Sequence, residues 1–134
     1  MIGLFLITHG SLGESLVQCA SHVLGKRPPQ LAQLGLCGQD SPTDSLPLAR
    51  DMLRLVDSGD GVLLLTDICG ATPANLARQL LVPGRVEGLA GVSLPMLLRA
   101  LTYRDKDMAT LVSRTVAGGR DGVLPMQEAK DAPG

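Results

Sequence analysis

The chain has 134 residues, of which 45% are hydrophobic and 19% charged, so it carries enough apolar material for a core and is not a disordered segment. Its 12 basic and 13 acidic residues give a net charge of −1, and aromatic residues make up only 1%. That balance argues against a nucleic-acid surface, which relies on basic charge and on aromatic rings for stacking. No apolar run approaches the roughly 20 residues of a membrane span, and the first apolar run has no basic leader, so we expect a cytoplasmic protein.

The three cysteines favour neither a disulfide framework nor a cysteine metal site, because their number is odd and no two of them form a Cys-x-x-Cys pair. We expect Cys19 and Cys37 to be small core residues and Cys69 to be a buried or inert thiol. No residue pattern requires a metal or another cofactor, and we expect none.

Short apolar runs alternate with segments of helical spacing along the whole chain. The runs predict strands over 2–7, 31–37, 61–65 and 86–92. The helical segments predict helices over 12–24, 46–56, 73–81, 95–101 and 108–115, the last ending at Gly118-Gly119. We expect a fifth short strand from Gly122 to Met126, one domain over 1–126, and a frayed tail over 127–134.

This alternation predicts an α/β fold, a flavodoxin-like open sheet of four parallel strands in the order 2-1-3-4 with helices on both faces. Such sheets bind ligands at the carboxyl ends of their strands, where the strand order reverses. Here the first and third strands end at His9 and Asp67, so we predict that these two residues face one crevice. The carboxylate would fix the tautomer of the ring and leave its other nitrogen free as a nucleophile or base.

The predicted crevice is suited to an anion. Helices are expected to begin after Ser11 and after Thr72, which brings free N–H groups and two hydroxyls to it, although an ordinary helix cap explains Ser11 equally well. Gly10 and Gly70 let the backbone approach a bound group. The sequence has neither a GxxxxGK[ST] nor a GxGxxG motif, so a phosphoryl group held on His9 fits better than a bound nucleotide.

Four segments together resemble the IIA component of the mannose-type sugar phosphotransferase system. They are Thr8-His9-Gly10, the stretch 67–75 (DICGATPAN), the stretch 91–97 (GVSLPML) and the stretch 118–123 (GGRDGV). They stand in the order of that family and roughly at its spacing, over nearly the whole chain.

The resemblance implies that His9 accepts a phosphoryl group from the phosphorylated carrier protein HPr and passes it to a separate IIB protein, in sugar uptake or its regulation. Asp67 matches the residue that orients the histidine. The implied phosphoryl-binding residues are Gly10, Ser11, Gly70, Ala71 and Thr72, with Ala71 standing where the family commonly has glycine.

The resemblance also implies an assembly. The expected partner is a second copy of the chain, with the segment from Gly122 to Met126 exchanged as an antiparallel edge strand. Leu94, Met96 and Leu97 are expected either to form an apolar docking patch beside the crevice or to belong to the core. Contact with a membrane is implied only through a transporter complex.

Three other functions stay open on the sequence. One is a regulatory module that signals through phosphorylation of His9 without a transporter. Another is a metal-handling protein of the chelatase kind, since those also open with a strand followed by His-Gly-Ser; it would need a second histidine near a strand end, and only His22 is available, on a predicted helix. The third is the phosphoryl-donor subunit of a dihydroxyacetone kinase.

Overall fold

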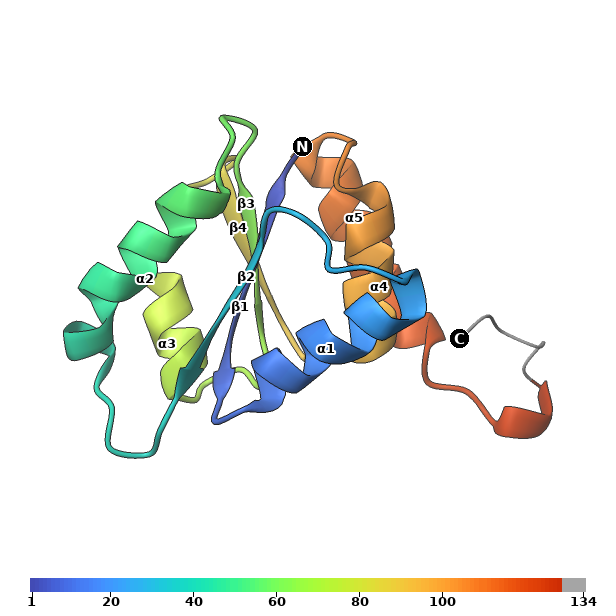
Figure 1. Cartoon of the computed structure of the whole chain (residues 1–134), viewed down its shortest axis with the longest axis horizontal. Coiled ribbons are helices and arrows are strands. Elements are labelled where there is room, and N and C mark those ends of the chain that lie inside the picture. Colours follow the sequence, from blue (N-terminus) through green and yellow to red (C-terminus); the bar gives the residue numbers. More distant parts are fainter. Residues whose placement is uncertain (129–134) are drawn as a thin grey trace.

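The computed structural model describes residues 1–128 and shows one sheet of four parallel strands in the order β2-β1-β3-β4 (Figure 1). The strands are β1 (Gly3–His9), β2 (Leu31–Leu36), β3 (Val62–Thr66) and β4 (Val86–Ala90). The predicted fold class and strand order are confirmed. Because all four strands run the same way, their carboxyl ends meet at one edge of the sheet, the lower edge in Figure 1.

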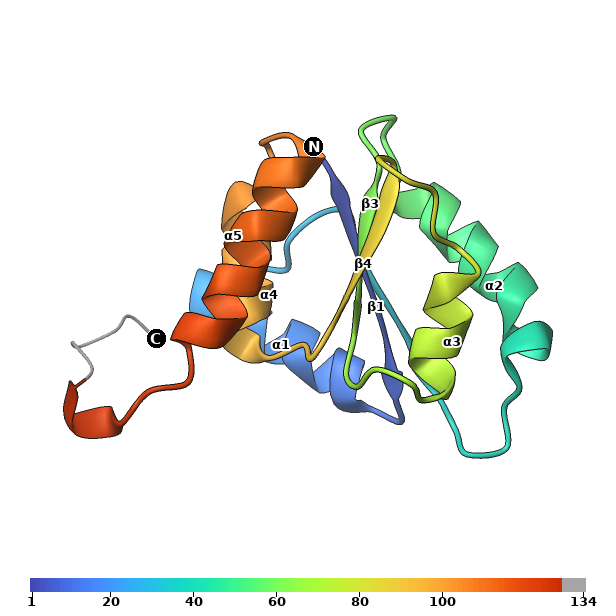
Figure 2. The ribbon, with the colours of Figure 1, turned by 180° about the vertical axis from the view of Figure 1, so that it is seen from behind.

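Helices cover both faces of the sheet, as the two opposite views show (Figures 1 and 2). On one face lie α2 (Pro42–Val56) and α3 (Thr72–Arg78). On the other lie α1 (Leu12–Leu24), α4 (Leu94–Tyr103) and α5 (Met108–Asp121), and a short 3-10 helix, Met126–Glu128, follows. Within residues 1–128, none of these helices combines the length and the apolar character that crossing a bilayer would take.

The two central strands are apolar up to their carboxyl ends because both of their faces are buried. Side chains alternate between the faces of a strand, so Leu4 and Leu6 pack on the α1, α4 and α5 side, whereas Phe5 and Ile7 pack on the α2 and α3 side. All four are fully buried. The end of β1 is therefore fixed from both faces.

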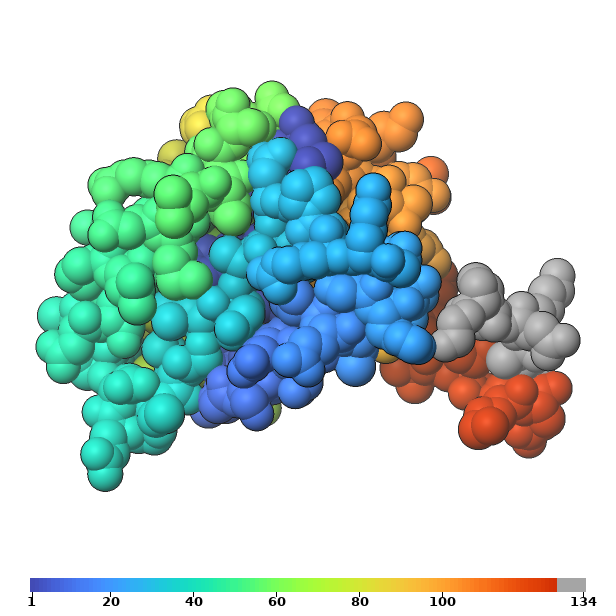
Figure 3. Space-filling view, in the orientation of Figure 1, coloured from blue at the N-terminus to red at the C-terminus, as the bar shows by residue number. Residues whose placement is uncertain are grey.

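The expected fifth strand is not formed, and the prediction that the last helix ends at its paired glycines is wrong. Helix α5 continues to Asp121, and 123–125 have no regular structure. The glycines serve close helix packing instead of termination, since a methyl group on Gly118 would lie 2.5 Å from Cβ of Arg99, and one on Gly122 would lie 2.6 Å from Cβ of Pro95. Beyond α5 the chain extends away from the packed sheet and helices, as Figure 3 shows for the segment before the grey residues. Most of the predicted tail, 129–134, lies outside the described residues.

The prediction that Cys19 and Cys37 are core residues is wrong, because both are exposed free thiols. Cys69 is also an exposed free thiol, so it is not buried; that it is inert stays a prediction.

The turn between α2 and β3, at the opposite end of the sheet from the expected site, is organised by one carboxylate. Asp57 accepts hydrogen bonds from the amides of Gly59 (2.8 Å) and Gly61 (3.1 Å), and Arg85 donates to its other oxygen at 3.0 Å. The hydrogen bond from Gly59 is the main reason that the pKa of Asp57 lies below its ordinary value, against the opposing effect of burial.

Asp57→Asn should therefore lower the free energy of unfolding at pH 7 by about 1 kcal/mol, because a neutral amide accepts these bonds less strongly. A depressed folded-state pKa means that the contribution of the carboxylate is complete above the ordinary pKa near 4 and is lost as the pH falls through the folded-state value. The difference from the unmodified protein should shrink between pH 7 and about pH 3 in urea denaturation. Asp51→Asn, at an exposed pair with Arg54, is the control; a difference for Asp57→Asn that does not change with pH would contradict this account.

Candidate functional site

His9 and Asp67, the two residues predicted to share a crevice, lie in direct contact at the carboxyl edge of the sheet. His9 is the last residue of β1, and Asp67 directly follows β3, the neighbouring parallel strand. One carboxylate oxygen of Asp67, Oδ2, lies 2.7 Å from Nδ1 of His9 and also accepts the His9 amide at 3.0 Å. A single oxygen thus holds both the backbone and the ring of the histidine.

This contact determines which ring nitrogen is available. Burial of Asp67 would by itself raise its pKa, but the amide and ring hydrogen bonds and the charge of His9 outweigh burial and lower the pKa below the ordinary value. The carboxylate is therefore ionised at neutral pH and can only accept hydrogen bonds, so Nδ1 carries the proton. In the neutral ring Nε2 is then unprotonated, on a side chain that is 52% exposed.

The junction between β1 and α1 differs from the expected ordinary cap. The cap is supplied from inside the sheet, where the buried Thr8 accepts the Gly13 amide at 2.8 Å through Oγ1. Ser11 occupies the N-cap position without a side-chain cap bond, and it is exposed. Its hydroxyl is therefore not used by the helix.

The backbone amide of Gly10 is already used within the fold. Its amide donates to the carbonyl of Leu36 at 2.9 Å, so this N–H is not available to a bound anion. Its φ of +52° is in the left-handed region that favours glycine, which explains the residue by conformation.

The loop from β3 to α3 brings Gly70, Ala71 and Thr72 beside Asp67 in sequence. Gly70 has a φ of +87°, again a conformation that favours glycine. The expectation that Thr72 caps α3 is wrong, because Ala71 occupies the N-cap position and Thr72 is the first helical residue. The Thr72 hydroxyl is consequently carried on the first turn of the helix, half-buried.

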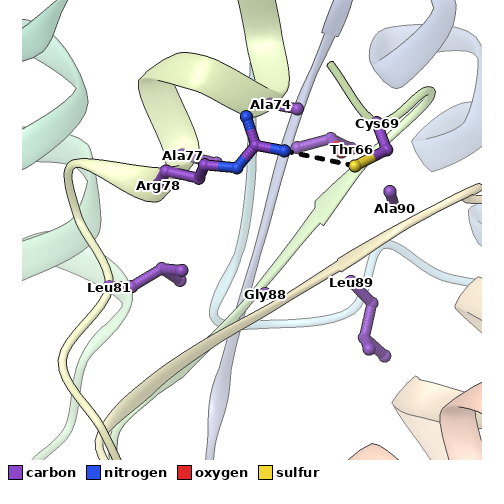
Figure 4. Close-up of a pocket in the computed structure, with 9 residues that line it drawn as sticks. All are labelled: Thr66, Cys69, Ala74, Ala77, Arg78, Leu81, Gly88, Leu89 and Ala90. Carbon is purple, nitrogen blue, oxygen red and sulfur yellow. Dashed lines mark hydrogen bonds between the residues drawn. The ribbon is translucent and has the colours of Figure 1, made fainter. Parts of the chain in front are cut away.

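Cys69 lies in the same loop and is tied to the end of α3. The Arg78 guanidinium donates to Sγ of Cys69 at 3.2 Å (Figure 4). It also donates to Oδ1 of Asn75 at 2.7 Å. A hollow of about 150 Å³ opens beside the bond to Cys69 and reaches Leu89 and Ala90 on β4.

Of the two roles expected for Leu94, Met96 and Leu97, a docking patch or the core, the structure supports the core, and Leu94 is half-buried against it. Met96 and Leu97 are 6% and 0% exposed and belong to the core, which excludes them from a docking patch in this chain. Leu12 and Ile68, which adjoin the site in sequence, are 41% and 57% exposed instead. Neither residue is among the docking residues that the resemblance implies; the available signal for Ile68 is that it lies beyond the strand end, where no sheet face can bury it.

Within the described residues, no three histidine, cysteine, aspartate or glutamate side chains come together in a way that could hold a metal ion.

Comparison with known protein families identifies the family of this chain. The model of a family described as the PTS system fructose IIA component, EIIA-man, matches residues 3–116. The chain belongs to this family. It is a mannose-type IIA component, as the sequence resemblance implied, and phosphotransfer in a sugar phosphotransferase system is the class of role that the family carries.

Individual relatives agree with that membership. The chain is 31% identical over 140 residues to the PTS system mannose-specific EIIAB component of Escherichia coli (strain K12), an alignment that covers 98% of this chain and 43% of the relative. The chain thus spans less than half the length of that relative. It is also 29% identical over 102 residues to the transcriptional regulatory protein LevR of Bacillus subtilis, covering 75% of this chain and 10% of LevR.

Solved structures share the fold. Phosphotransferase system component EIIA from Streptococcus agalactiae superposes with a TM-score of 0.82 at 21% identity, covering 96% of this chain and all of that one. The mannose/sorbose specific IIA subunit from Enterococcus faecalis gives a TM-score of 0.82 at 19% identity, covering 98% of each chain.

Asp67→Ala should weaken the preference of the His9 ring for the tautomer protonated on Nδ1. The hydrogen bond from Nδ1 to a carboxylate contributes about 1.5–3 kcal/mol, so its loss should reduce the preference for the Nδ1–H tautomer about tenfold or more. Nitrogen-15 NMR of the histidine ring measures this preference directly. Asp51→Ala on the exposed side of α2 is the matched control, and an unchanged ring spectrum in Asp67→Ala would show that the contact does not govern the ring.

Proposed function

We propose that this IIA component is a histidine phosphocarrier, which accepts a phosphoryl group from phospho-HPr on Nε2 of His9 and passes it to a IIB protein. The observation that carries the proposal is the contact between Asp67 and Nδ1, because it leaves Nε2 unprotonated on an exposed side chain. A nucleophile that meets another protein must be both free and accessible.

The transfer needs no proton to leave the site. The lone pair of Nε2 attacks the phosphorus of the phosphohistidine on HPr, and the phosphorus–nitrogen bond of the donor breaks with its electron pair returning to the donor ring. The new phosphorus–Nε2 bond places positive charge on the His9 ring, which keeps its Nδ1 proton and is stabilised by the Asp67 carboxylate. Attack on the same phosphorus by the IIB acceptor reverses these changes and restores neutral His9.

Groups around Nε2 are suited to the charge that spreads over the phosphoryl oxygens. The Ser11 hydroxyl makes no cap bond and stands at the N-terminus of α1, where the positive end of the helix dipole favours an anion. We assign the Thr72 hydroxyl and the backbone of Gly70 and Ala71 to the opposite side of the phosphoryl group. Gly10 contributes conformation, because its amide is already bonded.

Leu12 and Ile68 fit contact with the donor and the acceptor. Both are exposed apolar side chains, one from the β1–α1 side and one from the β3–α3 side of the site. Apolar residues beside a transferring group exclude water from it when a partner docks. They take this proposed role in place of Met96 and Leu97, which are buried.

A regulatory role remains the second candidate. The specific observation in its favour is the similarity to LevR, which is named as a transcriptional regulatory protein. It would use the same phosphorylated His9 and differ only in what reads the phosphoryl group.

We also propose that the chain forms a homodimer by exchanging the segment from Gly122 to Met126. The edge of β4 supports this, since hollows of about 150 Å³ and 370 Å³ adjoin β4, one lined by residues of α3 and the other by residues of α5. Val86, the first residue of β4, pairs with Val82, and the edge beyond it offers backbone groups to another chain. The exchanged segment has the matching property, because Val123 and Met126 are 86% and 89% exposed.

His9→Ala should abolish phosphoryl acceptance, because no other residue offers Nε2 at this position. The protein is incubated with phosphoenolpyruvate, enzyme I and HPr, and an acid-labile phosphate is located by intact mass and peptide mapping. His22→Ala is the matched control, since His22 is the second histidine of the sequence and is exposed on α1. Phosphate retained by His9→Ala, or lost in His22→Ala, would contradict the assignment.

Removal of residues 122–134 should convert a dimer into a monomer at micromolar concentration, as measured by sedimentation equilibrium. Removal of only 129–134 is the control and should leave the dimer intact, because it keeps the proposed strand. A dimer that survives the longer deletion would rule out exchange of this segment.

A further inference from the structure

Two backbone segments come close together beside His9, at a point where Gly35 has no room for a side chain. Gly35 lies on β2, opposite Thr8 in the parallel register. A methyl group at Gly35 would lie 2.0 Å from the carbonyl oxygen of Gly10 and 3.1 Å from its carbonyl carbon. The obstacle is backbone, so no side-chain rotation relieves it.

The same two segments are also joined by a hydrogen bond. The Gly10 amide donates to the carbonyl of Leu36, the residue after Gly35, at 2.9 Å. Strand β2 therefore determines the position of both peptide groups of Gly10: one through this hydrogen bond and the other through close approach. Gly10 is the residue that joins His9 to Ser11.

His9 is consequently held from two sides. From β3, Asp67 binds its amide and its ring. From β2, Gly35 and Leu36 fix the peptide that follows it. These contacts of Gly35 and Leu36 are made by backbone, so their contribution is geometric.

We propose that Gly35 is a positioning residue for phosphoryl transfer, acting through the carbonyl of Gly10 on the direction of His9 and on the place of Ser11. The inference rests on the proposed function for its kinetic consequence. A carbon at 2.0 Å from an oxygen must be relieved by a shift of about 1 Å or more, and misplacement of that size can slow an oriented reaction about 100-fold. The exposed Gly10 segment is the part able to shift, since the strand core is packed on both faces.

The test compares Gly35→Ala with Gly38→Ala, a matched control three residues along the chain where a methyl group meets no atom within 4 Å. With phospho-HPr as donor and a IIB protein as acceptor, so that His9 turns over, Gly35→Ala should lower kcat per folded molecule about 10- to 100-fold with KM little changed. Nitrogen-15 NMR without any donor should show a weakened Nδ1–H preference on His9. Gly38→Ala should match the unmodified protein in both measurements.

The two measurements separate this inference from the function on which it rests. If the unmodified protein accepts no phosphoryl group, the proposed function fails, while the ring spectrum still reports whether Gly35 positions His9. A variant that is only less stable would keep the ring spectrum and the kcat of its folded fraction. Normal kcat and a normal ring spectrum in Gly35→Ala would overturn the inference.

A second variant changes Gly10, the other partner in this contact. It keeps the inference testable if Gly35→Ala does not fold. Gly10→Val disfavours the left-handed backbone and turns the carbonyl away without altering β2. It should reproduce the loss of kcat and the change in the ring spectrum. Unchanged values in Gly10→Val would show that the carbonyl direction does not matter and would equally overturn the inference.

Discussion

One carboxylate oxygen, Oδ2 of Asp67, holds the candidate site together at the carboxyl edge of the sheet. Asp67 Oδ2 accepts both the amide and the ring of His9, so it joins the ends of two neighbouring strands at the same time as it selects a tautomer. The parallel pairing of β1 with β3 places both strand ends at one edge, and the two fully buried faces of these strands keep that pairing from slipping. The chemistry therefore depends directly on the register of the sheet.

Asp67 is half-buried, and its contacts with His9 keep the carboxylate ionised despite that burial. Removing a carboxylate from water favours its neutral form, but the bonds from His9 more than offset that tendency and keep the charge. A charge so held is available to stabilise positive charge on the ring once a phosphoryl group is attached. A carboxylate in open solvent would interact with the ring far more weakly, because water screens it.

The sequence predicted the strand order, and with it the pairing of His9 with Asp67, because apolar runs and the topological rule for parallel sheets depend on local pattern. The sequence predictions are wrong where the same residue type can serve two different structural roles. Gly118 and Gly119 were read as a helix end, whereas they let α5 approach Arg99 and Met96 on α4. Leu12 and Met96 both sit at helical spacing, and only the packed structure shows that the first is exposed and the second buried.

A phosphocarrier site faces opposing requirements. Its histidine must be exposed to two protein partners, yet its nitrogen must be placed closely enough for in-line transfer. Exposure removes the surrounding side chains that position a buried catalytic group, so backbone contacts have to do so instead. In this chain they are the Gly10 amide on Leu36, the Gly10 carbonyl against Gly35 and the Thr8 cap on Gly13. On the proposed function, residues without reactive groups would then contribute to transfer through geometry alone, and β2 would belong to the site through its contacts with Gly10.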